Sequence, residues 1–128
     1  MQKTIEAVKE FHDAFGIQVA HQPKARVEDR IIDLRYNLMK EENDEYLEAA
    51  RSGDLVEIAD ALGDMLYILN GTIITHGLQE KIGPVFEEIQ RSNMSKLDEN
   101  GKPIYREDGK VLKSALYFKP NISRILGE

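Results

Sequence analysis

Two groups of carboxylates lie close together in the middle of the chain. They are Glu41-Glu42-Asn43-Asp44-Glu45 and, further on, Glu57-Ile58-Ala59-Asp60 with Asp64. Glu42 and Glu45 are one helical turn apart, as are Glu57 and Asp60, so each pair shares one face of its helix. Like charges at this spacing repel each other, and a bound cation would offset the repulsion. Mg²⁺ prefers oxygen ligands of this kind, so the two pairs predict a metal site that could bind phosphate groups.

Two helices joined by a short turn are expected to position these pairs. The first helix is predicted over about 27–50, with one apolar stripe that consists of Val27, Ile31, Leu34 and Leu38. Steps of three or four residues continue this stripe to Glu41 or Glu42, then to Glu45. A turn follows at 51–54, where Asp54 is a suitable N-cap for the next helix. If the two helices pack antiparallel, both carboxylate pairs lie near the turn and face each other.

The helix that follows Asp54 has two distinct faces. Glu57, Asp60 and Asp64 share one side, which continues through Tyr67, Ile68 and Gly71. The opposite side is apolar and consists of Leu55, Ile58, Leu62, Met65, Leu66, Leu69 and Ile73. Because both sides resemble covered surface, the pattern predicts a helix at the centre of a bundle or at a subunit interface.

Some of these acidic residues also have ordinary structural interpretations. Asp44 and Glu48 are expected to be solvated surface charges. Glu57 lies three residues after Asp54 and could complete a capping box instead of binding metal. Asp64 could pair with an arginine. A Ca²⁺ site of the EF-hand type is not expected, because no glycine-containing loop of oxygen ligands is present.

The remaining elements complete an all-α chain with a small C-terminal extension. Thr4 is the predicted N-cap of a first helix that ends at Gly16, and 17–24 is an extended connection. Pro84 is expected in the first turn of a fourth helix. Asp108-Gly109 predicts a short hairpin, followed by a helical turn at 122–126. We therefore expect one domain over 1–128, with a helical core at about 4–97 and a hairpin and tail at about 98–128.

Composition limits the classes of function. The 128 residues include no cysteine, which excludes disulfides and thiolate metal sites, and the formal net charge is −6. This charge argues against broad binding to nucleic acid or to an anionic membrane. The N-terminus lacks the pattern of a signal peptide, and no apolar run approaches the roughly 20 residues of a membrane span. A cytoplasmic protein that binds a nucleotide through divalent cations is consistent with these features.

The two acidic segments resemble the EExxE…ExxD signature of the all-α nucleotide pyrophosphohydrolases, which include MazG-like enzymes, dimeric dUTPases and phosphoribosyl-ATP pyrophosphohydrolases. The resemblance implies a four-helix core of the MazG-like type, completed by formation of a homodimer or homotetramer. It implies Mg²⁺, with Mn²⁺ as a substitute, bound by Glu42, Glu45, Glu57 and Asp60. Glu41 would bind a further ion or orient the attacking water, which makes it the candidate catalytic residue. Asp64 matches nothing that the short motif requires, and it is kept as a second-rank member of the site.

Residues outside the two segments have supporting roles with open alternatives. Asn93 and Lys96, one turn apart on the fourth predicted helix, either bind phosphate or form an exposed polar helix end. The segment Ser92-Asn93-Met94-Ser95-Lys96 resembles the one that contacts phosphate in some branches of the superfamily. His12 either contacts a base or sugar or is an ordinary helix-face histidine. Tyr67 either lines the pocket or packs in the core.

Three functions are consistent with these features. The first is a Mg²⁺-dependent nucleoside triphosphate pyrophosphohydrolase that converts an NTP or dNTP to the monophosphate and pyrophosphate. The second is a phosphoribosyl-ATP pyrophosphohydrolase of histidine biosynthesis. The third is a non-catalytic, metal-binding module for helical oligomerisation. The base preference, the number of metal ions and the phosphorus that is attacked do not follow from the sequence.

Overall fold

A computed structural model describes all residues from Met1 to Glu128 and divides them into two compact units, Met1–Glu80 and Lys81–Glu128. The first unit contains α1 (Gln2–Phe15), α2 (Asp29–Ser52) and α3 (Leu55–Thr75). The second contains α4 (Ile82–Met94), β1 (Ile104–Tyr105), β2 (Val111–Leu112) and α5 (Ile122–Leu126). The all-α fold with a small C-terminal hairpin is confirmed. The assignment of 1–128 to one domain stays a prediction.

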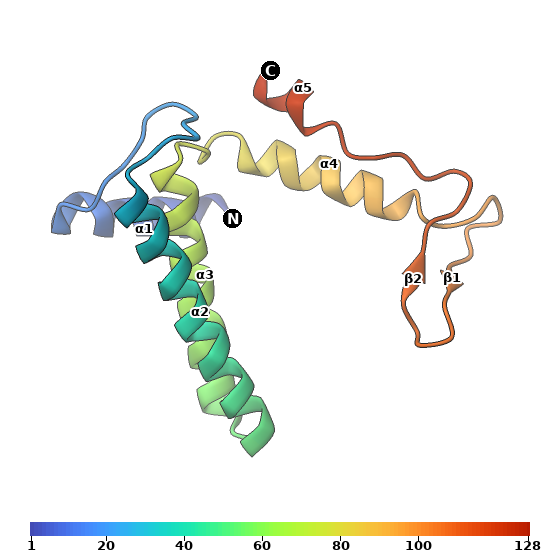
Figure 1. The fold of residues 1–128 in the computed structure, drawn as a ribbon, viewed down its shortest axis with the longest axis horizontal. Helices are drawn as coiled ribbons and strands as arrows, with labels where there is room; N and C mark the ends of the chain where they lie inside the picture. Colours follow the sequence, from blue (N-terminus) through green and yellow to red (C-terminus); the bar gives the residue numbers. More distant parts are fainter. The chain divides into compact units, whose positions relative to one another are not determined.

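In the first unit, α2 and α3 form an antiparallel pair, and α1 packs against α3 (Figure 1). Gly53 ends α2 in the left-handed conformation, with a φ of 71°, which a glycine adopts without a steric penalty. Asp54 then caps α3, because its Oδ1 accepts a hydrogen bond of 3.2 Å from the backbone N–H of Glu57. The predicted turn and cap are both confirmed.

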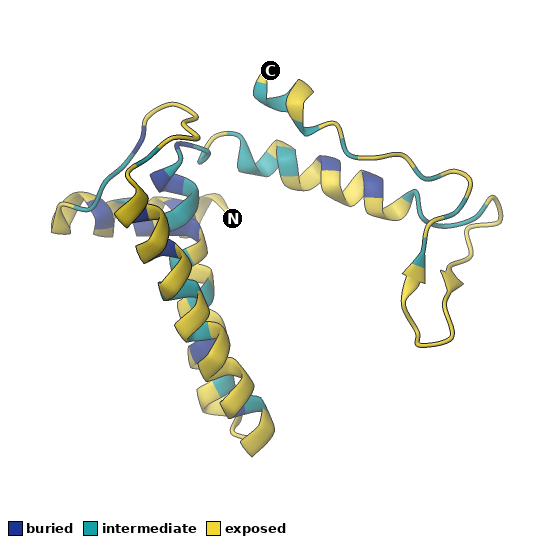
Figure 2. Ribbon diagram, viewed as in Figure 1, coloured by how far each residue is buried: buried dark blue, intermediate teal, exposed yellow.

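The core of this unit lies at the end of the α2–α3 pair where α1 packs. Ile5 and Val8 of α1 and Ile74 of α3 are almost completely buried there. The connection between α1 and α2 is fixed to the end of α3, since the Ala20 N–H donates to the Ile74 carbonyl and the Lys24 N–H to the His76 carbonyl. The other half of the helix pair is mostly exposed (Figure 2). That half carries both carboxylate pairs.

The expectation that both faces of α3 are covered is not met within the first unit. The apolar side chains at the start of the helix are the most open, with Leu55 77% and Val56 75% exposed. Leu62, Leu66 and Leu69 are each close to half exposed. An isolated apolar residue on a surface is common, but a continuous apolar face is typical of an interaction site.

Two further details of the helices differ from the prediction. Thr4 is not the N-cap of α1: the helix begins at Gln2, and the Thr4 hydroxyl donates to the Met1 carbonyl at 2.7 Å. On α2, the stripe that faces α3 contains Arg35, which is 9% exposed, whereas Leu34 is 49% exposed. Arg35 lies four residues after Ile31 and Leu34 lies three residues after it. In the helix the position four residues on, Arg35, faces α3, and Leu34 is the more exposed of the two.

The second unit consists of α4 and the segment that folds back along it. Pro84 lies in the first turn of α4, as predicted. Gly109 turns the hairpin with a φ of 87°, and the two strands pair antiparallel. Glu88 is 5% exposed and accepts hydrogen bonds from the Asn121 N–H at 2.7 Å and from Arg91 at 3.1 Å. The bond from Asn121 holds the tail against α4, and the bond from Arg91 lies within the helix. None of the helices in either unit combines the length and apolar character needed to cross a bilayer.

Candidate active site

A polar cleft lies at the end of the α2–α3 pair, next to the turn that joins the two helices. Its volume is about 460 Å³, and its walls come from both helices: Glu45, Glu48, Ala49, Ser52, Glu57 and Asp60. This volume lies within the range of roughly 300–1,000 Å³ that is typical of small-molecule sites. The structure therefore brings three of the four predicted ligands, Glu45, Glu57 and Asp60, to one cleft.

Glu42, the fourth predicted ligand, lies one turn before Glu45 on the side of α2 that faces α3. Its Oε2 atom is buried and has no hydrogen-bond partner. Loss of hydration raises the pKa of the Glu42 carboxyl to about 7. A hydrogen bond shared with the Glu45 carboxyl adds to this shift, and the charges of Glu45, Asp64 and Asp60 add further to it. Asp64, the second-rank candidate, therefore acts electrostatically on the same group. A buried carboxylate oxygen that lacks a donor and is surrounded by like charges would be stabilised by a bound cation.

Within the first unit, no positive side chain forms an ion pair with these carboxylates. None of the ion pairs in the structure includes Glu42, Glu45, Glu48, Glu57 or Asp60. Lys40, the nearest lysine in the sequence, pairs with Asp44 at 2.9 Å on the exposed surface of α2. This pair confirms that Asp44 is a surface charge. The acidic cleft is left to be neutralised by ions from solution.

The capping-box interpretation of Glu57 is wrong. In a capping box the side chain of this residue would accept a hydrogen bond from the N–H of Asp54. That N–H instead donates to the Ala49 carbonyl at 3.1 Å. Only the backbone N–H of Glu57 takes part in the cap, through the Asp54 side chain. The Glu57 carboxylate is therefore free to face the cleft.

The carboxylate oxygens of the cleft are suitable ligands for a hard divalent cation, but the side chains do not point to one common centre. No three acidic or histidine side chains are close enough together to form a metal cluster as they stand. Carboxylate oxygens in a polar cleft are nevertheless the ligands that Mg²⁺ takes, and Mg²⁺ usually keeps several waters between itself and the protein. The buried Oε2 of Glu42, which has no hydrogen-bond partner, also fits a cation, and this observation does not depend on the composition of the cleft wall. The assignment of individual metal ligands stays a prediction.

Three other predicted site residues are not among those that line the cleft. Glu41 is exposed on α2 and does not line the cleft, so its role in orienting water stays a prediction. Asn93 and Lys96 belong to the second unit, where Asn93 is exposed at the end of α4 and its carbonyl accepts from the Lys96 N–H at 3.2 Å. Phosphate binding by these two residues also stays a prediction.

Sequence reasoning missed Glu48, which was assigned to the solvated surface. It is exposed but forms part of the cleft wall. A signal was present, because Glu48 follows Glu45 by three residues and so continues the acidic stripe by one turn.

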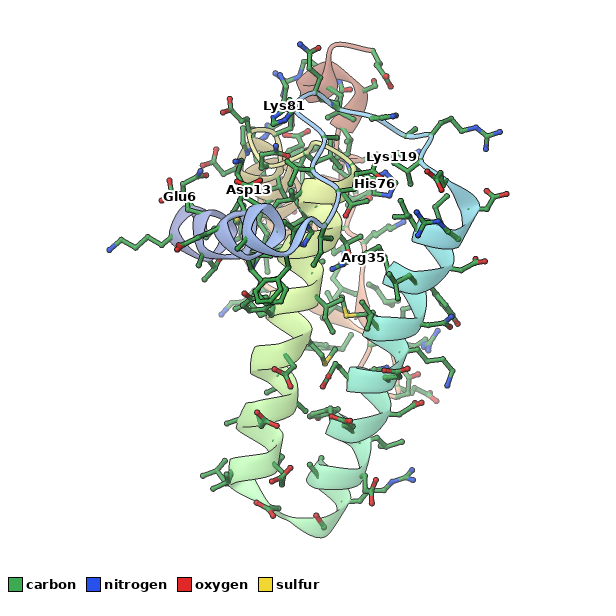
Figure 3. The ribbon with its side chains drawn as sticks, turned by 90° about the vertical axis from the view of Figure 1, so that its left-hand side faces the viewer. Glu6, Asp13, Arg35, His76, Lys81 and Lys119 are labelled. Atoms are coloured by element: carbon green, nitrogen blue, oxygen red, sulfur yellow. The ribbon has the colours of Figure 1, made fainter.

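A buried polar cluster around Arg35 was also missed. Arg35 lies between α2 and α3 (Figure 3), where its Nε donates to Thr72 Oγ1 at 3.1 Å and its Nη2 to the Ile68 carbonyl at 2.9 Å. Burial lowers the pKa of Arg35. His12, 2% exposed, packs nearby with Nδ1 3.1 Å from the Gln18 carbonyl, and burial also lowers the pKa of this imidazole. The contacts of His12 favour the structural interpretation of this residue. Gly71 lies against both groups, since a Cβ there would clash with Arg35 and His12.

Comparison with known proteins agrees with this arrangement. Residues 8–93 match the phosphoribosyl-ATP pyrophosphohydrolase family. The chain belongs to this family. The matched region contains both carboxylate pairs and most of α1 to α4. The family consists of nucleotide pyrophosphohydrolases, so the predicted membership of the all-α superfamily is confirmed.

Two individual proteins extend the comparison. A crystal structure of a candidate NTP pyrophosphohydrolase from Exiguobacterium sp. 255-15 has a similar fold, with a TM-score of 0.52 and 27% sequence identity, and the alignment covers 97% of this chain and 94% of that chain. The predicted MazG-like fold is thereby confirmed. The uncharacterized protein L479 of Acanthamoeba polyphaga mimivirus is 33% identical over 119 residues. The match includes 84% of this chain but only 45% of that protein, so the chain spans less than half of this relative.

Proposed function

We propose that this protein is a Mg²⁺-dependent nucleoside triphosphate pyrophosphohydrolase that converts an NTP or dNTP to the monophosphate and pyrophosphate. The observation that carries the proposal is the acidic cleft between α2 and α3, with the buried, unpartnered Oε2 of Glu42 beside it. A polyanion cannot approach this many carboxylates without cations between them. Family membership and the likeness to a candidate NTP pyrophosphohydrolase support the same reaction class.

Each carboxylate has a role in this proposal. Glu42, Glu45, Glu57 and Asp60 would hold the metal ions, and Mg²⁺ when bound supplies the positive charge that phosphates require and activates water. Glu41 would orient the attacking water, and Asn93 and Lys96 would contact phosphate. The raised pKa of Glu42 has a direct consequence for this chemistry. Near neutral pH the carboxyl is partly protonated, and it must lose that proton before it can bind a cation.

Phosphoribosyl-ATP is the second candidate substrate. The name of the matched family favours it, while the likeness to a candidate NTP pyrophosphohydrolase favours ordinary nucleotides. The cleft itself does not distinguish the two, because both substrates present the same chain of phosphates to the metal. A direct comparison of phosphoribosyl-ATP with a panel of NTPs and dNTPs, by pyrophosphate release in Mg²⁺ buffer, separates them.

We also infer that two or four copies of the chain assemble. The half of the α2–α3 pair that carries the carboxylates has no further helix of its own unit over it, and the apolar face of α3 is exposed. A second copy would bury Leu55, Val56 and Leu62 and would complete a helical bundle around the cleft. Analytical ultracentrifugation measures the assembly directly. Replacing Leu62 with glutamate should dissociate it.

The substrate panel tests the proposed reaction against the third alternative, a non-catalytic metal-binding module. Glu57→Gln should abolish pyrophosphate release while the melting temperature in metal-free buffer is unchanged or higher, because one like charge is removed. Asp44→Asn is the matched control, since it removes a charge that is paired with Lys40 on the surface. If no nucleotide is cleaved although Mg²⁺ binds, and Glu57→Gln affects only assembly, the non-catalytic module is the correct function.

A further inference from the structure

A second cavity in the first unit lies between α1 and α3, separate from the acidic cleft. Its volume is about 210 Å³. Its lining consists of Thr4, Ala7 and Val8 from α1 and of Gly63, Leu66, Tyr67 and Asn70 from α3. Sites for whole drug-sized ligands usually measure roughly 300–1,000 Å³, so this cavity has room for one planar ring system and not for an entire nucleotide.

Asn70 is the polar group in this apolar lining that lacks a partner. The residue is 2% exposed, and its Nδ2 makes no hydrogen bond within the protein. A buried amide without a partner lowers stability, and it is rare enough in folded proteins to need an explanation. A ligand that presents a hydrogen-bond acceptor inside the cavity would provide one.

Tyr67 connects the lining of the cavity to the side of α3 that carries the carboxylates. Asp60, Asp64 and Tyr67 follow each other at intervals of four and three residues, so they share one face of the helix. Gly63, at the near end of the cavity, is about 4.5 Å along the helix axis from Asp60, and Tyr67 is about 10 Å from it. These distances are no longer than a nucleotide. A nucleotide whose phosphates lie at the cleft can therefore place its base in the cavity.

Tyr67 gives the cavity an aromatic wall. Its ring meets the ring of Phe11 edge to face, with the centroids 5.6 Å apart, so α1 holds the tyrosine in place. Leu66 and Val8 supply the apolar surface on either side. An aromatic ring next to apolar side chains and one amide is a suitable environment for a nucleobase, which is planar and has hydrogen-bonding groups along its edge.

We propose that the cavity between α1 and α3 binds the nucleobase of the substrate, with Asn70 Nδ2 donating to an acceptor on the base edge and Tyr67 packing against the base. This inference rests on the proposed hydrolysis of a nucleotide at the acidic cleft. It makes Asn70 a residue that contributes to base binding, since a base whose acceptor lies out of reach of Nδ2 would leave the amide unpaired. The amide takes no part in the cleavage step.

The first test is Asn70→Leu, which keeps a similar volume and removes the hydrogen-bonding group. We expect at least a 10-fold rise in KM for the preferred nucleotide, a kcat within a few-fold of the wild-type value, and a melting temperature that is equal or higher. Asn37→Leu, the same change at an exposed position of α2, should leave KM unchanged. A lower melting temperature of Asn70→Leu with unchanged KM would show that the amide is structural, and would overturn the proposal.

The second test isolates base binding from the metal site. Nucleosides carry no phosphate, so their binding in EDTA-treated buffer cannot depend on the acidic cleft. Saturation-transfer NMR with the wild-type protein should detect the preferred nucleoside and rank the bases, and Asn70→Leu should lose the signal. If the signal is absent from the wild type or equal in both proteins, the base does not bind here.

The two proposals fail in different ways. If the wild-type protein cleaves no nucleotide, the proposed function is wrong, and the nucleoside experiment still decides whether the cavity binds a base. If cleavage occurs but Asn70→Leu changes only the concentration dependence of melting, an apolar side chain of a second copy fills the cavity. That result would overturn the base site and leave the hydrolase intact.

Discussion

Replacing Glu42 with glutamine is a direct test of the electrostatics of the cleft. In the folded protein the Glu42 carboxyl has a pKa of about 7, raised first by lost hydration and then by Glu45, Asp64 and Asp60. Its ordinary value is 4.5. Between these two values the folded state binds the proton more tightly than the unfolded state does, so the contribution of Glu42 to stability falls as the pH rises from 4.5 to 7. Above pH 7 the carboxyl is ionised in both the folded and the unfolded state, and the charge of Glu42 then lowers the free energy of unfolding by its full amount.

The size of this penalty follows from the difference in pKa. Since one unit corresponds to about 1.4 kcal/mol, the shift sets a ceiling of about 3 kcal/mol at pH 8. Because Glu42 is only half-buried, solvent screening reduces this figure, and about 1–2 kcal/mol is the expected gain from Glu42→Gln in metal-free buffer. The same variant should gain almost nothing at pH 4.5, where the wild-type carboxyl is already protonated.

Thermal or urea unfolding in EDTA at pH 4.5, 6 and 8 measures this gain. Asp44→Asn is the control, because Asp44 is exposed and paired with Lys40, so its replacement should give a small loss at pH 8. A Glu42→Gln variant whose stability relative to wild type does not change with pH would refute the described environment of Glu42. A loss of stability at pH 8 would do the same.

Three further predictions follow from the structure. Mg²⁺ binding should release more protons at pH 7 than at pH 9, because a protonated Glu42 must ionise before it binds the cation. Calorimetry in buffers of different ionisation enthalpy measures this release, and equal release at both pH values would contradict the prediction. Asp54→Ala should cost about 1 kcal/mol of stability by urea unfolding, because the cap to the Glu57 N–H is lost, whereas a cost near zero would mean that the cap is unimportant. Gly71→Ala should destabilise the first unit by about 1–3 kcal/mol, because the new Cβ would press on the fixed Arg35 and His12; a neutral effect in the same assay would show that this cluster adjusts freely.

The helices could be predicted because their signals are local. Asp54 as a cap, Pro84 in a first turn and the Asp108-Gly109 hairpin each depend on a few neighbouring residues, and the structure has all three. Thr4 is not the cap, because a threonine inside a helix can donate to the carbonyl three residues earlier instead of accepting from an N–H ahead of it. The element that packs on the apolar face of α3 could not be predicted from the sequence. The apolar pattern of a helix is the same whether it packs against another helix of the chain or against a second copy of the chain.

The site was predictable in outline for a similar reason. Two carboxylates at i and i+3 on each of two helices that meet at a turn have few arrangements available, and Glu45, Glu57 and Asp60 line one cleft. Glu48 was missed because an exposed position was equated with a position without function. Asn70 was missed because one amide among apolar residues gives no periodic signal, and its unpaired Nδ2 is visible only in three dimensions.

The most direct test of the central claim is pyrophosphate release from a panel of NTPs, dNTPs and phosphoribosyl-ATP with Mg²⁺, measured for the wild-type protein and for Glu57→Gln. The proposed function predicts that the wild type releases pyrophosphate from at least one nucleoside triphosphate and that this release depends completely on the metal. The rate should fall by at least about 100-fold in the variant, whose fold should be intact. Turnover that persists in EDTA or in Glu57→Gln, or a wild-type protein that binds Mg²⁺ and cleaves none of the substrates, would contradict it.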